Sequence, residues 1–183
     1  MPDAASTPPL APLPADRPVR VLFVCWGNIC RSPTAEALFR RMVDDAGLAA
    51  AIEIDSAGTS AEHAGDRPDR RAVAEAARRG LDLRGQRARK VRPDDWDRFD
   101  LLLVADTPVE RNLVRMAPDD RRRAKVHRMT DFGPDAGRVD EVPDPYYGGP
   151  DGFSHVYEVL DRACRGLLDR LQAAGAGPQG PRP

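Results

Sequence analysis

A short loop, from Cys25 to Ser32, separates an apolar run from a helical pattern that begins near Pro33. Cys25 and Arg31 lie near the two ends of this loop, with five residues between them. On a tight turn between a strand and a helix N-terminus, anions are bound by backbone N–H groups, the positive end of the helix dipole and a bidentate guanidinium. The loop is therefore predicted to cradle a phosphate. The same field should hold Cys25 as a thiolate, a nucleophile that needs no separate base.

The length and charge of the chain point to one domain. Its 183 residues, 41% of them hydrophobic, suffice for a sizeable core. A formal net charge of -1 argues against a nucleic-acid or membrane partner, because such proteins are strongly basic. Two basic runs, residues 84–92 and 121–123, are interpreted as solvated faces, with a docking patch for an acidic phosphoprotein as the alternative.

The cysteines indicate a reducing compartment. There are three of them, an odd number that does not make a disulfide scaffold. A permanent bridge between Cys25 and Cys30 would block the predicted nucleophile, so we expect a cytoplasmic protein. No apolar run approaches the roughly 18 residues of a membrane span. The thiols and dispersed histidines offer no tetrahedral spacing, so no metal is expected.

The two ends of the chain are rich in small residues and proline or glycine. Residues 1–18 contain no sustained apolar segment of the kind that a signal peptide needs and are expected to be a disordered extension. Residues 19–172 form the predicted domain, and residues 173–183 a flexible tail.

Between these ends, short apolar runs alternate with helical patterns, which is typical of an α/β fold with a parallel sheet and helices on both faces. Ser32 is the expected N-cap of the first helix and Pro33 its first residue, and Gly47 ends it. A loop at residues 130–151 is unusually long, which favours a functional role for it. Strands are expected at 19–24, 52–56, 101–105 and 125–129, and further helices at 69–79, 108–116 and 153–171.

Residues within the Cys25–Ser32 loop suit a phosphate cradle. Gly27 permits close approach of the backbone to an anion, and Asn28 tolerates the left-handed conformation that a cradle requires. Ser32 can place a hydroxyl beside the thiolate. The alternative for Cys25 is a buried, inert thiol at the end of a strand.

With its other motifs, the chain resembles the low-molecular-weight protein tyrosine phosphatases. The resemblance spans Arg20 to Leu171 and implies a single-domain, four-stranded parallel sheet in the order 2-1-3-4. That order places the phosphate-binding loop, or P-loop, after strand 1 at the topological switch point, where ligands usually bind. The motifs are residues 25–33 with Ala35-Glu36, residues 55–59, residues 68–80, residues 99–106 and residues 144–147.

The resemblance also implies roles for the loop residues. Cys25 accepts the phosphoryl group, Arg31 clamps its oxygens, Asn28 shapes the loop and Ser32 stabilises the thiolate as a leaving group. Ser56 is expected to hydrogen-bond to Asn28. The other substrate-binding residues of the loop are Trp26, Gly27, Ile29 and Cys30.

A second motif, Asp144-Pro145-Tyr146-Tyr147, supplies the remaining chemistry. Asp144 matches the general acid of the family, which protonates the departing phenolate and then activates water. Pro145 restricts Asp144 to an extended conformation, which helps to aim the carboxylate. Tyr146 and Tyr147 are expected to wall a slot for an aromatic ring. The alternatives are an ordinary turn at Asp144-Pro145 and core packing of at least one tyrosine.

Several other side chains leave two interpretations open. Cys30 either forms a reversible, protective disulfide with Cys25 under peroxide or merely packs on the loop. His63 borders the substrate slot or faces solvent. Trp26 is bulky and occupies a variable position of the family loop, whereas Cys164 is expected in the core.

The predicted function is therefore hydrolysis of phosphotyrosine through a cysteinyl-phosphate intermediate, with no metal or organic cofactor. Expected partners are phosphotyrosine-containing proteins and a cognate tyrosine kinase; the oligomeric state is not predicted. A thioredoxin-coupled arsenate reductase of the same fold needs further thiols, and no cysteine lies between Cys30 and Cys164. A phosphoarginine phosphatase would carry threonine where this chain has Ile29. A non-catalytic phosphate sensor would not need Cys25, Arg31 and Asp144 together.

Overall fold

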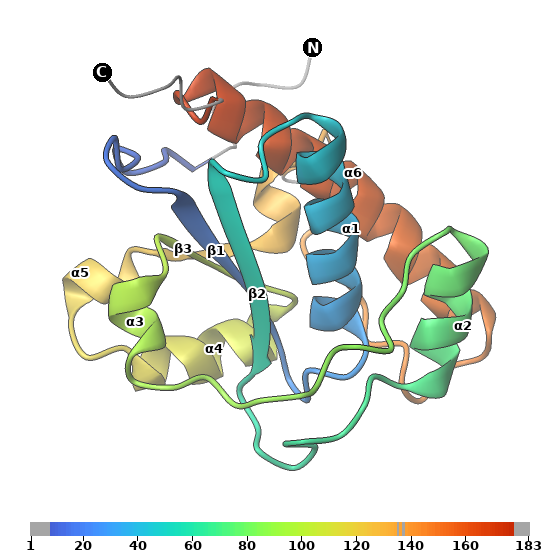
Figure 1. Ribbon diagram of the computed structural model, residues 1–183. Coiled ribbons are helices and arrows are strands. Elements are labelled where there is room, and N and C mark those ends of the chain that lie inside the picture. Colours follow the sequence, from blue (N-terminus) through green and yellow to red (C-terminus); the bar gives the residue numbers. More distant parts are fainter. Residues whose placement is uncertain (1–7, 135, 137, 178–183) are drawn as a thin grey trace.

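Strand β1, Val19–Cys25, is the centre of a parallel sheet (Figure 1). It pairs along its whole length with β2, Ile52–Gly58, and over residues 21–24 with β3, Leu101–Val104. β4, Val126–Arg128, completes the order β2-β1-β3-β4, which confirms the predicted topology. The computed structural model describes residues 8–134, 136 and 138–177.

Helices cover both faces of the sheet, as expected for strands that are apolar on both sides (Figure 1). Val21 and Phe23 of β1 belong to the core beneath α1, α2 and α6, whereas Leu22 and Val24 belong to the core beneath α3 and α4. This alternation follows the two-residue period of a strand. The helices are α1 (Arg31–Asp45), α2 (Arg70–Arg78), α3 (Asp95–Arg98), α4 (Thr107–Met116), α5 (Asp120–Arg123), the 3-10 helix η1 (Met129–Phe132) and α6 (Asp151–Ala173).

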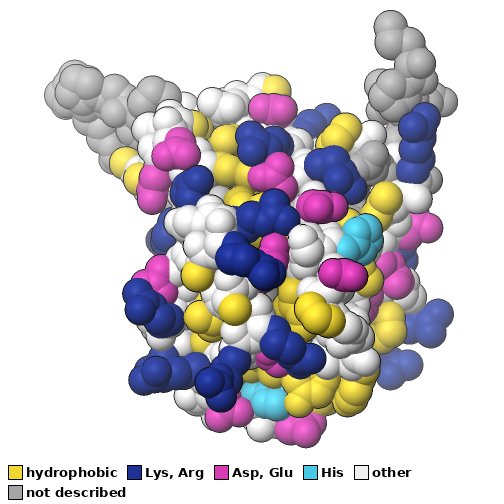
Figure 2. Space-filling model, turned by 90° about the vertical axis from the view of Figure 1, so that its right-hand side faces the viewer, with side chains coloured by type: hydrophobic (Ala, Val, Ile, Leu, Met, Phe, Trp, Pro, Cys, Tyr) yellow, Lys and Arg dark blue, Asp and Glu magenta, His cyan; other side chains and the backbone are white. Residues whose placement is uncertain are grey.

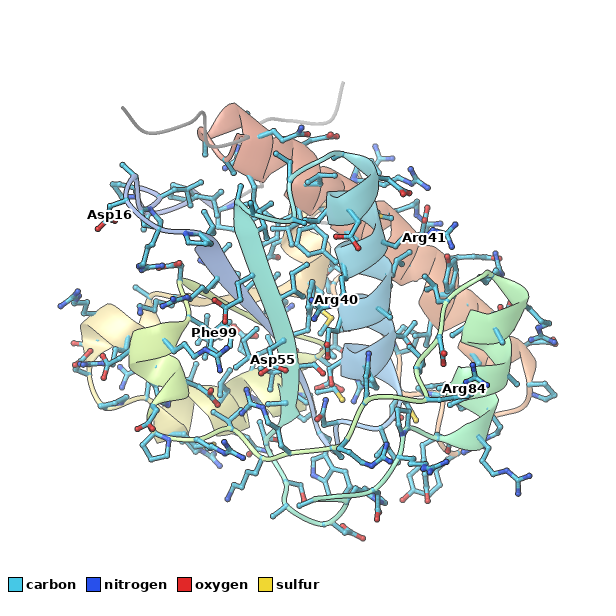
Figure 3. All side chains as sticks on the ribbon, in the orientation of Figure 1. Asp16, Arg40, Arg41, Asp55, Arg84 and Phe99 are labelled. Atoms are coloured by element: carbon cyan, nitrogen blue, oxygen red, sulfur yellow. The ribbon has the colours of Figure 1, made fainter. Side chains whose placement is uncertain are left out.

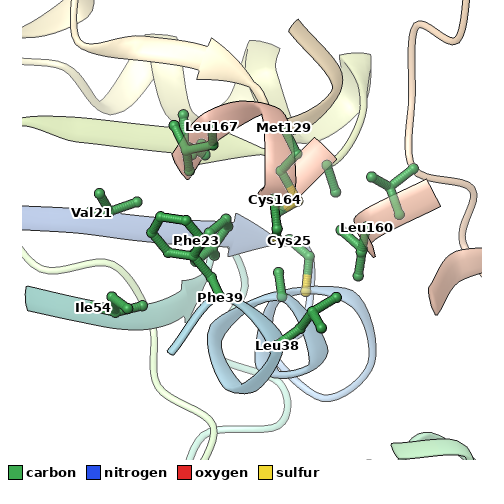
Figure 4. Packing of buried hydrophobic residues seen from close by; sticks show 14 of the residues in the cluster. Val21, Phe23, Cys25, Leu38, Phe39, Ile54, Met129, Leu160, Cys164 and Leu167 are labelled. Atoms are coloured by element: carbon green, nitrogen blue, oxygen red, sulfur yellow. The ribbon is translucent and has the colours of Figure 1, made fainter. Parts of the chain in front are cut away.

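The larger core brings the end of β1 against α1 and α6 (Figure 4). Cys25 ends the strand with its sulfur directed toward α1, and Phe23 and Phe39 pack edge to face with ring centroids 5.6 Å apart. Cys164 of α6 is buried in the same cluster, which confirms its expected place in the core. The predicted nucleophile is therefore the last residue of the central strand, where the loop to α1 begins.

Helix α1 starts earlier than expected. Its first residue is Arg31 and its N-cap is Cys30, so Ser32 is not the cap and Pro33 is not the first residue. The Ser32 hydroxyl lies 3.0 Å from the Cys25 sulfur. The expected capping role was wrong because this hydroxyl interacts with the thiol instead of with the helix terminus.

Three short helices were not predicted. α3, α5 and η1 each have four residues, too few for a helical period to show in the sequence. η1 occupies the start of the expected 130–151 loop, where it packs against α6.

The terminal segments contact the domain. Leu10 and Leu13 pack against the larger core, and the Arg17 guanidinium pairs with Asp100 at 2.7 Å. At the other end, α6 continues to Ala173, and Ala176 is buried. Part of the expected extension and tail therefore packs on the fold; residues 1–7 and 178–183 lie outside the described residues.

The face that carries α1, α2 and α6 mixes basic and acidic side chains (Figure 2). Ion pairs one helical turn apart, such as Arg40–Glu36 and Arg165–Asp161, account for part of this pattern. Such exposed pairs contribute little to stability. No helix among the described residues is both long and apolar enough to cross a bilayer.

Gly166 of α6 allows a close contact between this helix and η1, and its substitution is our first prediction. A Cβ at this position would overlap the Phe132 carbonyl oxygen of η1. Gly166→Ala should therefore lower the free energy of unfolding by about 1–3 kcal/mol, as overpacking does, although alanine favours a helix by about 1 kcal/mol over glycine. Urea denaturation measures this difference.

Gly85→Ala is the matched control, because a Cβ there meets nothing within 4 Å. Its free energy of unfolding should stay within about 0.5 kcal/mol of the wild type. A Gly166→Ala protein as stable as the wild type would show that η1 and α6 do not pack as described.

Candidate active site

The loop between β1 and α1 is shaped by Asn28. This residue has a φ of 57°, the one left-handed conformation among the described non-glycine residues, and asparagine tolerates it. Its side chain is held on both sides: Nδ2 donates to Ser56 Oγ at 3.0 Å, and Oδ1 accepts from the Arg89 backbone N–H at 2.9 Å. The hydrogen bond expected between Ser56 and Asn28 is present.

The end of β2 supports the loop from behind. A Cβ at Gly58 would lie 2.6 Å from the Trp26 carbonyl oxygen, so only glycine lets the two backbones approach this closely. Ser56 donates to Glu36 Oε2 at 2.6 Å, and Glu36 also pairs with Arg40, labelled on α1 in Figure 3. Glu36 thus extends the hydrogen-bond chain from the loop to the surface.

The Cys25 sulfur receives hydrogen bonds from the turn that encloses it. The backbone N–H of Asn28 donates to Sγ at 3.3 Å, and Ser32 Oγ lies 3.0 Å from Sγ. Ser32 Oγ in turn accepts from Asn28 Nδ2 at 2.8 Å, and its own proton has two acceptors within reach, the sulfur at 3.0 Å and the Ala57 carbonyl at 3.4 Å. These donors favour negative charge on the sulfur, the state in which cysteine is a nucleophile.

The Arg31 guanidinium is buried beside the thiol, with its side chain 3% exposed. Its Nη1 donates to Asp106 Oδ2 at 2.5 Å and to the Val142 carbonyl at 3.0 Å. Burial alone would lower the pKa of Arg31, but its electrostatic interactions with Cys25 and Asp106 outweigh this effect and raise that pKa. Nη2 and Nε make no hydrogen bond to the described residues, so both remain donors for an anion.

Asp106 is a site residue that the sequence analysis did not identify. It follows β3 and caps α4, where its Oδ1 accepts from the Val109 N–H at 2.9 Å. Its other oxygen is therefore aimed at Arg31. The available signal was its place after a strand parallel to β1, because the carboxyl ends of parallel strands meet at one edge.

Asp144 lies across the pocket from the nucleophile loop. Its Oδ2 is 3.6 Å from Arg31 Nη2, and its Oδ1 accepts from the Tyr146 N–H at 3.1 Å. The side chain is 46% exposed, so solvent reaches it. The start of this loop is tied to the sheet by a hydrogen bond of 2.8 Å from the Val142 N–H to the Ala105 carbonyl.

These groups enclose a pocket of about 130 Å³. Trp26, His63 and Tyr146 form consecutive ring contacts around it, with centroids 6.2 Å and 6.4 Å apart. Tyr146 and Tyr147 are 38% and 93% exposed, so core packing is wrong for both. The lining residues are Cys25, Trp26, Gly27, Ile29, Cys30, Arg31, Glu62, His63, Asp144, Tyr146 and Tyr147.

Two expected substrate-binding residues do not line this pocket. Asn28 and Ser32 are buried, and their side chains turn inward to hold the loop and the sulfur. Conversely, His63 borders the pocket, where its ring lies against Gly27. Glu62, at the same rim, was not identified from the sequence, since nothing local marks it.

Cys30 lies in the pocket wall but remains a thiol at neutral pH. Burial, reinforced by the nearby Asp69 carboxylate, raises the pKa of Cys30 far above that of a free cysteine. Both cysteines of the loop are buried, but their partners differ: hydrogen-bond donors and an arginine lie beside Cys25, whereas the Asp69 carboxylate lies near Cys30.

Part of the basic run at residues 84–92 is not a solvated face. Arg89 pairs with Asp55 at 2.9 Å and with the buried Asp95 at 2.8 Å, and its backbone holds Asn28. Asp55 projects from β2 in Figure 3, whereas Arg84 lies well away from it and pairs with Asp82. Arg89 therefore supports the nucleophile loop.

Comparisons with known proteins agree with this geometry. The family model for low molecular weight phosphotyrosine protein phosphatase matches residues 20–176. A low molecular weight protein-tyrosine-phosphatase of Streptomyces coelicolor is 46% identical over 150 residues, which cover 81% of this chain and 91% of that protein. The crystal structure of YfkJ from Bacillus subtilis is 34% identical with a TM-score of 0.82, covering 88% of this chain and 99% of that one.

A protein tyrosine phosphatase from Entamoeba histolytica, crystallised with Hepes in the active site, is 35% identical with a TM-score of 0.80, covering 85% of this chain and 97% of that one. The fold, the thiol-bearing loop and these matches lead to one conclusion: the chain belongs to the low molecular weight phosphotyrosine protein phosphatase family.

Proposed function

We propose that this protein hydrolyses phosphotyrosine in proteins through a phosphorylated Cys25. The observation that carries the proposal is the Cys25 sulfur, which accepts from the Asn28 N–H at 3.3 Å and lies 3.0 Å from Ser32 Oγ at a pocket edged by aromatic rings. A thiolate there attacks phosphorus as the bond from phosphorus to the phenolic oxygen breaks. The free donors of Arg31 stabilise the phosphoryl oxygens.

Asp144 acts as the general acid and then as the general base. In the first step it donates a proton to the departing phenolate, a poor leaving group. In the second, its carboxylate takes a proton from a water molecule that attacks the phosphocysteine. The sulfur–phosphorus bond breaks, inorganic phosphate leaves, and Ser32 stabilises the thiolate that returns.

The pocket suits an aromatic phosphate. Trp26, His63 and Tyr146 surround it with ring faces and edges, which pack well against a flat phenyl ring. Phosphoserine is too short for its phosphate to reach Cys25 from the rim. We therefore infer that the substrates are phosphotyrosine-containing proteins, supplied by a tyrosine kinase.

The other thiols argue against the arsenate reductase alternative. Of the described cysteines, Cys164 of α6 is buried in the core, and only Cys30 shares the pocket with Cys25. A reductase of that type needs more thiols within reach of the nucleophile. The free cysteines also support a reducing compartment, and we propose the cytoplasm as the location.

The second prediction concerns the acid. Asp144→Asn should slow an aryl phosphate whose phenol has a high pKa by about two orders of magnitude, and one whose phenol has a low pKa by less than about tenfold, since only the former needs a proton to leave. Steady-state rates on matched aryl phosphates measure both. Asp140→Asn, an exposed change on the same loop, is the control. Equal losses on both substrates would make Asp144 structural.

The third prediction separates phosphotyrosine from phosphoarginine. Ile29 lines the pocket and offers only apolar surface, whereas a threonine hydroxyl there could orient attack on a P–N bond. The wild type should prefer phosphotyrosine by at least about two orders of magnitude in kcat/KM, or roughly 2.7 kcal/mol. Ile29→Thr should reduce the ratio of kcat/KM for phosphotyrosine to kcat/KM for phosphoarginine. Faster hydrolysis of phosphoarginine by the wild type would overturn the assignment.

A further inference from the structure

Arg71 joins three segments that meet beside the pocket. Its Nη1 donates to the Tyr146 carbonyl at 3.0 Å, in the loop that carries Asp144. Its guanidinium carbon lies 5.4 Å from the centre of the Tyr146 ring and 4.8 Å from that of Phe153, in the first turn of α6. Arginine is well suited to such a position because its planar group stacks on rings while its edges donate hydrogen bonds.

Asp69 anchors the same guanidinium to the nucleophile loop. Its carboxylate accepts from Arg71 Nε at 3.0 Å and Nη2 at 2.9 Å. The Asp69 backbone N–H donates to the Ile29 carbonyl at 2.8 Å. A continuous path of hydrogen bonds therefore runs from the Cys25 loop through Asp69 and Arg71 to the acid loop, residues 143–150, which carries Asp144.

The acid loop needs such an anchor. Residues 143–150 lie outside any helix or strand, and all but Pro145 are exposed. Asp144 is held by the Tyr146 N–H and by an ion-pair distance of 3.6 Å to Arg31. Misplacing a reacting group by about 1 Å costs on the order of 100-fold in rate, so a loosely held carboxylate would be a poor acid.

We propose that Arg71 is a positioning residue that holds the acid loop, and with it Asp144, in register with Cys25. This inference rests on the proposed phosphatase function. The Arg71 side chain is 44% exposed, so its ion pair contributes little to folding. The hydrogen bonds from Arg71 lower the pKa of Asp69, which keeps the pair ionised and the anchor intact at neutral pH.

Arg71→Ala tests the proposal, with Arg70→Ala as its matched control. Arg70 is the preceding, exposed residue, and its side chain makes no ion pair or hydrogen bond to the described part of the chain. For an aryl phosphate with a poor leaving group, Arg71→Ala should lower kcat by about 10- to 100-fold, and for one with a good leaving group by less than about threefold, since that group needs no acid. Arg70→Ala should change neither rate.

Further measurements separate positioning from folding. Inorganic phosphate binds only to the cradle, so its inhibition constant for Arg71→Ala should equal that for the wild type. The Tm of the variant should also be unchanged. Arg71→Lys should recover only part of the rate, because an ammonium cannot reproduce the planar fork. In an Asp144→Asn background, Arg71→Ala should cause no further loss, since both changes remove the same contribution.

Two outcomes overturn the role of Arg71 in an active enzyme: equal slowing of both substrates, or a full additional loss in the Asp144→Asn background. A wild-type protein that fails to hydrolyse aryl phosphates would overturn the proposed function together with this inference. The wild-type rate therefore distinguishes the two failures.

Discussion

The site depends on the left-handed backbone of Asn28. That conformation, at φ 57°, turns the chain around the Cys25 sulfur so that the Asn28 N–H points at it. The side chain fixes the same turn through Ser56, Ser32 and Arg89. Because one residue both shapes the loop and orients the hydroxyl of Ser32, the donors are in place before a phosphate arrives, and no reorganisation is needed during the reaction.

The parallel sheet makes this arrangement possible. β1 and β3 end at the same edge of the sheet. Cys25 and Asp106 therefore lie close together, with the Arg31 guanidinium between them. The acid loop enters at this edge through the hydrogen bond between Val142 and Ala105. The nucleophile and the clamp thus come from one loop and the acid from a segment distant in sequence, and Arg31 Nη2 lies 3.6 Å from Asp144 Oδ2.

The sequence predicts a structural feature well when residues close together in the chain determine it, and poorly when the feature depends on contacts with remote segments. The strand order was predicted from the family resemblance. The phosphate-binding role of the Cys25 loop was predicted from its own residues, because a thiol, a glycine and an asparagine on one turn together define its chemistry. Asp106, Glu62 and Arg71 were missed since their roles arise from contacts with remote segments, at Arg31, the pocket rim and Tyr146. The start of α1 was misplaced for a related reason: Ser32 has the right chemistry for a cap but lies beside a thiol.

The central claim is that Cys25 carries the phosphoryl group during turnover. The most direct measurement is to quench the enzyme with acid during hydrolysis of a phosphotyrosine peptide and to map the modified residue by mass spectrometry. The account predicts one added phosphoryl group on the peptide that contains Cys25, and none in an inactive Cys25→Ser protein. Turnover without a phosphorylated Cys25, or a phosphoryl group on another residue, would contradict it.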